Sequence, residues 1–146
     1  MSLRLAVFDW NGTLYDDREI CYLPVEAIFR YFGIEPPPPQ EYWDEIGHDY
    51  MKFYEQHGIT AGSDELNEIR TAFLQSYPIK PNLHPGARKT IERAKRRGMH
   101  TAIVSGEKEE LIFPELARFG LFPSTVLDRV EPHSQDKRAV LSRLCA

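Results

Sequence analysis

The sequence is poor in cysteine and in long apolar runs, and each shortage excludes a class of protein. Its two cysteines, Cys21 and Cys145, lie far apart and show no metal-ligand spacing, which predicts reduced thiols in a reducing compartment. No apolar run reaches the roughly 18 residues that span a membrane. The N-terminal apolar stretch is too short for a signal peptide and is closed by Asp9. We therefore predict a cytoplasmic protein that has no membrane partner.

Positive charge is also in deficit. The 146 residues include 22 acidic side chains against 18 lysines and arginines, a net charge of −4, which argues against a nucleic-acid partner. At 42% hydrophobic and 27% charged, the composition is that of a folded domain, and it excludes collagen-like and wholly disordered chains. The length allows a sizeable core but not two independent domains of usual size.

Short apolar runs bounded by polar or turn residues predict three buried strands. They are Leu3–Phe8, Thr101–Val104 and Thr125–Leu127. Helical patterns cover Arg88–Arg97, which begins after a Pro-Gly pair and stops at Gly98, and Gln135–Leu144. Strands that alternate with helices predict parallel strands joined by right-handed crossovers, and hence an α/β fold.

Residues 17–83 differ from the rest of the sequence in that they show no clear strand pattern. An amphipathic stretch, Ile20–Phe32, ends at Gly33, and the prolines of Pro36–Pro39 predict a stiff extended connector. Further helical stretches follow at Tyr42–Ile46, Tyr50–Tyr54 and Leu66–Phe73. We predict a helical insert over 17–83 that could act as a lid, and a core formed by 1–16 and 84–146.

The strongest chemical signal is a carboxylate at the end of the first predicted strand. Asp9 is followed at once by a glycine-containing loop, and ligands of open α/β sheets bind at the carboxyl ends of strands. A carboxylate placed there can act as a nucleophile and form an acyl-phosphate. Gly12 lets backbone N–H groups approach a phosphate oxygen. The alternative is that Asp9 only caps a turn.

Two further positions help to decide between these interpretations. Ser105-Gly106 ends the second predicted strand, where a hydroxyl and free N–H groups can hold an anion. Lys137 opens the last predicted helix and can neutralise charge. Singly they are a helix cap and a surface lysine, but in this order after strand ends they favour a phosphate site.

These segments resemble the haloacid dehalogenase-like hydrolase superfamily, in its phosphoglycolate-phosphatase-like branch. Asp9-Trp10-Asn11-Gly12-Thr13 resembles the family's first motif, Val104-Ser105-Gly106 the second, and Lys137 the lysine of the third. The insert matches the family's α-helical cap. The resemblance implies a Rossmann-like parallel sheet, here incomplete with about three core strands, that has helices on both faces. It also implies magnesium-dependent hydrolysis of small phosphorylated metabolites.

The resemblance further implies roles for single residues. Asp9 would attack phosphorus and, with the backbone carbonyl of Asn11, would bind Mg²⁺. Asn11 stands where the family usually carries the acid–base aspartate. By its place in the motif it belongs to the implied catalytic set, which comprises Asp9, Asn11, Ser105 and Lys137. The phosphoryl oxygens would be held by Gly12, Thr13, Ser105, Gly106 and Lys137.

Two departures from the family pattern predict impaired chemistry. An amide at Asn11 cannot supply general acid–base help, typically worth 10²–10⁴-fold, so we expect slow turnover or a long-lived phospho-Asp9. The family's fourth, acidic motif is absent, because no Asp or Glu follows Lys137. Without the strand that carries this motif, the first strand becomes an exposed edge.

Several alternatives stay open at this point. The chain could be a fragment of a longer phosphatase, the interpretation that we favour, or it could form a homodimer through the exposed edge of strand one, or it could be a catalytically empty remnant. In function, the alternatives to a phosphohydrolase are a non-catalytic binding or regulatory module and a phospho-accepting switch.

Overall fold

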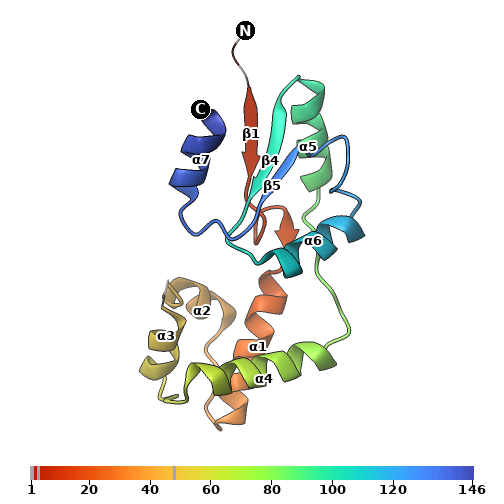
Figure 1. The fold of residues 1–146 in the computed structure, drawn as a ribbon. Coiled ribbons are helices and arrows are strands. Elements are labelled where there is room, and N and C mark those ends of the chain that lie inside the picture. The colour runs from red at the N-terminus through yellow and green to blue at the C-terminus, as the bar shows by residue number, and fades with distance from the viewer. Residues whose placement is uncertain (1, 3, 48) are drawn as a thin grey trace. The chain divides into compact units, whose positions relative to one another are not determined.

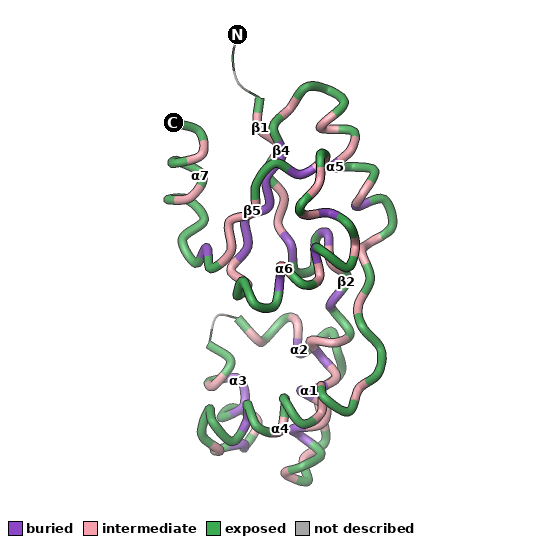
Figure 2. Tube along the Cα trace, turned by 45° about the vertical axis from the view of Figure 1, so that its right-hand side comes forward, coloured by how far each residue is buried: buried purple, intermediate pink, exposed green. Residues whose placement is uncertain are grey.

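A computed structural model of the chain describes residue 2, residues 4–47 and residues 49–146. It divides into two compact units (Figure 1). The core unit comprises Met1–Asp17 and Pro81–Ala146, and the helical unit comprises Arg18–Lys80. Each unit has its own cluster of buried hydrophobic side chains, and Figure 2 shows buried segments in both.

The core unit contains a parallel sheet whose strands lie in the order β1–β4–β5. Their bounds are Leu5–Phe8 (β1), His100–Val104 (β4) and Arg129–Glu131 (β5). Phe8 pairs with Ile103, and Ile103 with Val130. Helices α5 (Ala87–Arg96) and α7 (Lys137–Cys145) lie on opposite sides of the sheet in Figures 1 and 2. The predicted α/β fold, with an incomplete parallel sheet and helices on both faces, is confirmed.

The predicted position of the third strand is wrong. Thr125–Leu127 is irregular, and the strand lies at Arg129–Glu131 instead. Leu127 is buried because its side chain packs into the core cluster from the segment that leads to β5. The strand itself carries charged residues on both sides of Val130, so its composition conceals it. Leu3, the first residue of the first predicted strand, lies outside the described residues.

A second, two-stranded sheet closes the core unit where the chain leaves and re-enters it. β2 (Tyr15–Asp16) and β3 (Asn82–Leu83) pair antiparallel, with Tyr15 opposite Leu83. The Tyr15 ring stacks on Trp10 at 4.8 Å between centroids, and its hydroxyl donates to Glu115 of α6 (Glu109–Arg118) at 2.9 Å. Burial and this carboxylate raise the pKa of Tyr15. These contacts anchor the loop between β1 and β2.

Within its described residues, the helical unit has four helices: α1 (Arg18–Tyr31), α2 (Pro39–Glu45), α3 (Tyr50–Gln56) and α4 (Ser63–Ser76). Pro39 begins α2 rather than belonging to an extended connector, because proline fits the first helical turn. Gly33 follows the end of α1 with φ +70°, a left-handed conformation that glycine adopts without steric cost.

Aromatic rings hold these helices together. Phe29 of α1 is fully buried, and its ring centroid lies 5.9 Å from those of both Phe53 and Tyr54 on α3. Burying such rings is the main apolar contribution to a small domain. None of the described helices combines the length and the apolar character needed to cross a membrane.

Candidate active site at the carboxyl end of the parallel sheet

Asp9 lies directly after β1 in a tight turn. The Trp10 carbonyl accepts hydrogen bonds from the N–H groups of the three residues that follow Gly12, at 3.2, 3.1 and 3.0 Å. Gly12 has φ +72°, which a residue with a Cβ rarely adopts. The turn carries Thr13 back to Asp9, whose Oδ2 accepts a hydrogen bond from the Thr13 hydroxyl at 3.3 Å.

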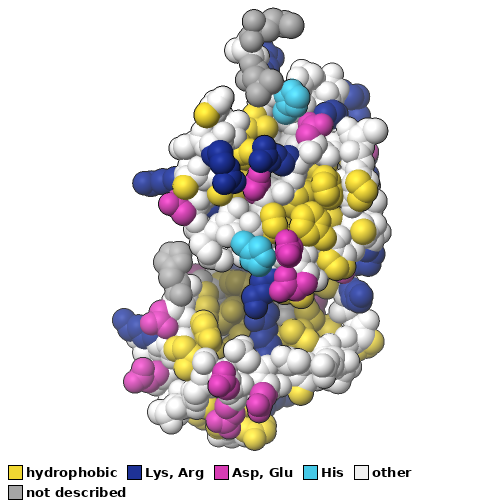
Figure 3. Space-filling view, in the orientation of Figure 1, with side chains coloured by type: hydrophobic (Ala, Val, Ile, Leu, Met, Phe, Trp, Pro, Cys, Tyr) yellow, Lys and Arg dark blue, Asp and Glu magenta, His cyan; other side chains and the backbone are white. Residues whose placement is uncertain are grey.

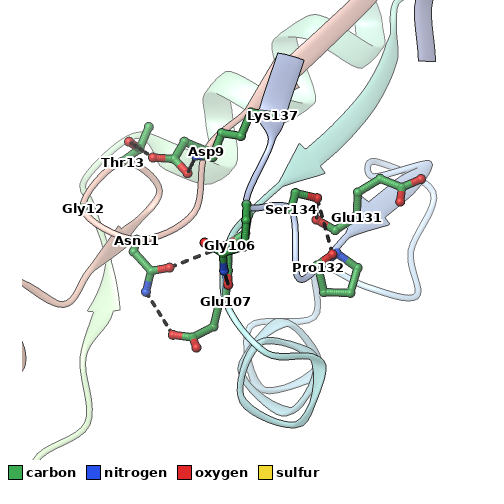
Figure 4. A network of polar contacts seen from close by, with 12 residues as sticks. Asp9, Asn11, Gly12, Thr13, Gly106, Glu107, Glu131, Pro132, Ser134 and Lys137 are labelled. Carbon is green, nitrogen blue, oxygen red and sulfur yellow. Dashed lines mark hydrogen bonds and ion pairs between the residues drawn. The ribbon is translucent and has the colours of Figure 1, made fainter. Parts of the chain in front are cut away.

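Lys137 reaches the same carboxylate from the other end of the chain (Figure 4). Its Nζ lies 2.7 Å from Asp9 Oδ1, and the two side chains are 45% and 43% exposed. Lys137 is the first residue of α7, and Asp136 caps this helix by accepting the N–H groups of Arg138 and Ala139. An ion pair this exposed adds little to stability. The cap therefore fixes where a solvent-facing lysine meets Asp9.

Asn11 turns its side chain toward β4 and not toward Asp9. Its Oδ1 accepts a hydrogen bond from the Ser105 hydroxyl at 3.4 Å, and its Nδ2 donates to Asp17 at 2.8 Å and to Glu107 at 3.4 Å. The amide thus bridges two carboxylates and a hydroxyl. Each of these contacts suits an amide, which can donate and accept at once. An aspartate in its place would face two like charges.

The predicted phosphate donors fall into two groups. Thr13 and Lys137 form the exposed group described above, and both donate to Asp9. In the other group, the Gly12 N–H donates to Asp17 Oδ1 at 2.8 Å, and Ser105 is 1% exposed, with its hydroxyl also accepting the Glu107 N–H at 3.1 Å. Gly12 and Ser105 are therefore engaged within the protein.

Three residues near the site were missed by sequence reasoning. Asp17 is 5% exposed and accepts from both Gly12 and Asn11. Glu107 follows the second motif by two residues, and Gln135 donates to the Gly106 carbonyl at 3.2 Å. The available signal was weak, since an acidic residue just after a strand also begins many helices.

Residues 3–145 match the haloacid dehalogenase-like hydrolase family, and the chain belongs to this family. It is 27% identical over 110 residues to phosphoglycolate phosphatase of Aquifex aeolicus (strain VF5), covering 75% of this chain and 52% of that protein. It is 26% identical over 124 residues to phosphoglycolate phosphatase 1 of Pseudomonas aeruginosa, covering 77% and 45%. The chain thus spans about half the length of the curated relatives that it matches.

Solved structures agree on the fold. The crystal structure of a predicted phosphoglycolate phosphatase from Haemophilus somnus 129PT superposes with a TM-score of 0.71 at 18% identity, covering 99% of this chain and 71% of that one. Similarity at this identity establishes the fold alone. Together with the family match, it confirms the resemblance inferred from the motifs.

Proposed function

We propose that the protein hydrolyses small phosphate monoesters through a covalent aspartyl-phosphate on Asp9, in the cytoplasm. The observation that carries the proposal is the solvent-facing pair formed by Asp9 and Lys137, 2.7 Å apart at the carboxyl end of the parallel sheet. The family match and the phosphoglycolate phosphatase relatives support this choice of chemistry. Which phosphate ester is the substrate is left open by the proposal.

In the first step, an Asp9 oxygen bonds to phosphorus as the bond from phosphorus to the ester oxygen breaks. The leaving oxygen takes that electron pair and a proton from water, because the Asn11 amide has no acidic proton to give. Water then attacks phosphorus, which restores the Asp9 carboxylate and releases inorganic phosphate. Without an acid–base residue at position 11, we expect this second step to be slow.

Charge decides which residues must assist. Two unit negative charges about 4 Å apart repel by about 4 kcal/mol at an effective dielectric constant of 20, and a phosphate dianion roughly doubles that. Lys137 supplies one positive charge, and the Thr13 hydroxyl can donate to a phosphoryl oxygen. The Gly106 N–H also belongs to the proposed phosphate site. To join it, the Ser105 hydroxyl would exchange its hydrogen bond to Asn11, and the Gly12 N–H its hydrogen bond to Asp17, for bonds to phosphoryl oxygens.

Mg²⁺ suits the donor set of this site. Asp9 and the Asn11 carbonyl offer hard oxygens, and Mg²⁺ is commonly held by one or two carboxylates together with waters and substrate phosphates. A bound Mg²⁺ would offset the charge of the phosphoryl group. Both Asp17 oxygens already accept hydrogen bonds, so waters and substrate oxygens would complete this donor set.

We further propose that the helical unit is the cap of this enzyme. Its separate hydrophobic core supports this, because a unit that folds around its own side chains can move as a body.

Phosphate release from p-nitrophenyl phosphate, with and without Mg²⁺, tests the proposal. We expect slow, Mg²⁺-stimulated release that Asp9→Asn abolishes. Asp16→Asn removes an exposed carboxylate seven residues away and is the matched control, which should retain the rate. Equal rates in wild type and Asp9→Asn would refute the proposal.

A binding module without turnover is the second candidate. It is favoured by the Asn11 side chain, which supplies no acid–base group for turnover and instead donates a hydrogen bond to Asp17. The two candidates differ in one readout. The module retains inorganic phosphate in a Lys137-dependent manner but releases none from p-nitrophenyl phosphate.

We also propose that the outer edge of β1 pairs with a second copy of the chain. Among the described residues β1 pairs only with β4, Val7 is 37% exposed, and no residue of α7 is buried. An unpaired apolar edge invites strand pairing. Light scattering should show a concentration-dependent dimer that Val7→Lys disrupts, and a monomer at high concentration would contradict this.

A further inference from the structure

The helical unit contains a cavity of about 330 Å³, lined by residues of α1, α2, α3 and α4. Its apolar wall includes Val25, Ile28 and Leu66, which are 4%, 2% and 2% exposed. The rings of Tyr42 and Tyr54 form another wall. Ligand sites are typically concave, mostly apolar and about 300–1,000 Å³ in volume, so this cavity suits a small molecule.

One charged side chain, Arg70 of α4, lines this cavity, and none of the lining residues is acidic. No ion pair joins Arg70 to a carboxylate within the part of the chain that the structure describes. Its charge reaches the cavity wall: burial raises the pKa of Tyr42 and of Tyr54, and Arg70 opposes that rise at both hydroxyls.

Arg70 is an exposed basic residue in a unit that is otherwise acidic. The helical unit carries eleven acidic side chains against five lysines and arginines, and acidic side chains gather on its visible face in Figure 3. Arg30 of the same unit pairs with Glu26 one helical turn away. Arg70 instead borders a cavity whose walls are aliphatic and aromatic.

We propose that this cavity binds a small organic anion whose apolar body is about the size of one aromatic ring. The oxyanion head would receive paired N–H donors from the Arg70 guanidinium, a geometry that suits carboxylate and phosphate alike. The body would pack between the tyrosine rings and the aliphatic wall. Every lining residue belongs to the helical unit, so this site stands or falls independently of Asp9.

Cys21 provides a test in the intact 146-residue chain, because it lines the cavity whereas Cys145 is exposed on α7. Phenylacetate is the probe, 2-phenylethanol is the uncharged match, and inorganic phosphate is the anion without a body. We expect phenylacetate to slow iodoacetamide alkylation of Cys21 several-fold and saturably, with Cys145 unaffected. Phenyl phosphate distinguishes a phosphate head from a carboxylate head.

Variants decide whether Arg70 holds the anion. Arg70→Gln should weaken phenylacetate binding roughly 10- to 100-fold in calorimetric titration, the usual cost of a charge-assisted pair. Arg30→Gln is the matched control and should bind like wild type. Calorimetry does not depend on thiol reactivity, and circular dichroism checks that each variant folds.

The proposal would be overturned by no saturable phenylacetate binding, by equal affinity in Arg70→Gln, or by equal protection of Cys21 by 2-phenylethanol or inorganic phosphate. Because Asp9→Asn leaves the cavity intact, this variant should still bind phenylacetate even if it releases no phosphate. That result separates this site from the proposed hydrolysis.

Discussion

The two units of the chain differ in their charge and in the side chains that they bury. The core unit has eleven acidic and thirteen basic side chains, and it gathers polar groups where its parallel strands end. The helical unit is strongly acidic, buries aromatic rings around Phe29 and leaves Arg70 beside an apolar cavity. The contrast supports assigning the proposed phosphoryl chemistry to the core unit and the proposed anion site to the helical unit, so that variants can test each one separately.

The largest expected effect is a loss of phosphate release caused by a substitution in the core unit, with the helical unit unchanged. Lys137→Met removes the positive charge next to Asp9, and we expect the rate of phosphate release to fall about a thousandfold, as for loss of a principal electrostatic stabiliser. Lys137→Arg should retain more activity because it keeps the charge. A fall of only a few-fold in the Met variant would remove Lys137 from the site.

The next effect breaks the helical unit. Phe29→Ala deletes a fully buried ring. We therefore expect the free energy of unfolding of the helical unit to fall by about 3–5 kcal/mol. Each unit holds one tryptophan, Trp10 in the core unit and Trp43 in the helical unit, so single-tryptophan variants report each unit separately in urea. The Trp43 transition should shift more than the Trp10 transition.

Equal shifts of both transitions would show that the units unfold together. Ile103→Ala, in the core unit, is the reciprocal variant and should shift the Trp10 transition more.

Sequence reasoning recovered the arrangement of elements because their signals are local. The apolar runs before Asp9 and Ser105 marked two of the three strands, and glycines at 33 and 98 marked the ends of two helices. The third strand escaped because Arg129 and Glu131 are charged, while Leu127 supplies the apolar contact from outside the strand.

The site was less predictable, because its contacts join distant segments. The motifs identified Asp9 and Lys137, which lie 128 residues apart and meet in the structure. No periodicity could reveal that Asn11 would contact Glu107, 96 residues away, since only the fold brings β1 and β4 together. Likewise, the cavity beside Arg70 exists only once four helices pack.

A smaller effect is expected on the rate at which phospho-Asp9 is hydrolysed. In Asn11→Asp, the new carboxylate would face Asp17 and Glu107, and their negative charges would disfavour the ionised form that must accept a proton from water. We expect the double variant Asn11→Asp/Glu107→Gln to hydrolyse phospho-Asp9 about 100-fold faster than wild type, within the usual range of acid–base help. The single Asn11→Asp variant should gain less, with Glu107→Gln as the baseline. A single variant as fast as the double one would contradict the repulsion.

The smallest effect concerns the stability of the core unit against pH. Lys95 and the Thr101 N–H hold the pKa of Asp128 below its usual range. The folded state therefore favours the charged carboxylate, so the stabilisation is present above the unfolded pKa of about 3.9 and is lost as pH falls through the lower folded value.

Asp128→Asn should lower the free energy of unfolding by about 1 kcal/mol at pH 7, given that the side chain is partly exposed and screened. The difference from wild type should shrink at pH 3 in urea titrations followed by Trp10. A difference that is constant with pH would show that the charge does not matter.

The central proposal is that Asp9 is the nucleophile that bonds to phosphorus. Mass spectrometry of the chain after incubation with acetyl phosphate tests this most directly. We predict a mass gain of one phosphoryl group on the peptide that contains Asp9, removed by hydroxylamine and absent in Asp9→Asn. A gain that persists in Asp9→Asn, or phosphate release by wild type without any trapped phosphoryl group under rapid acid quench, would contradict the account.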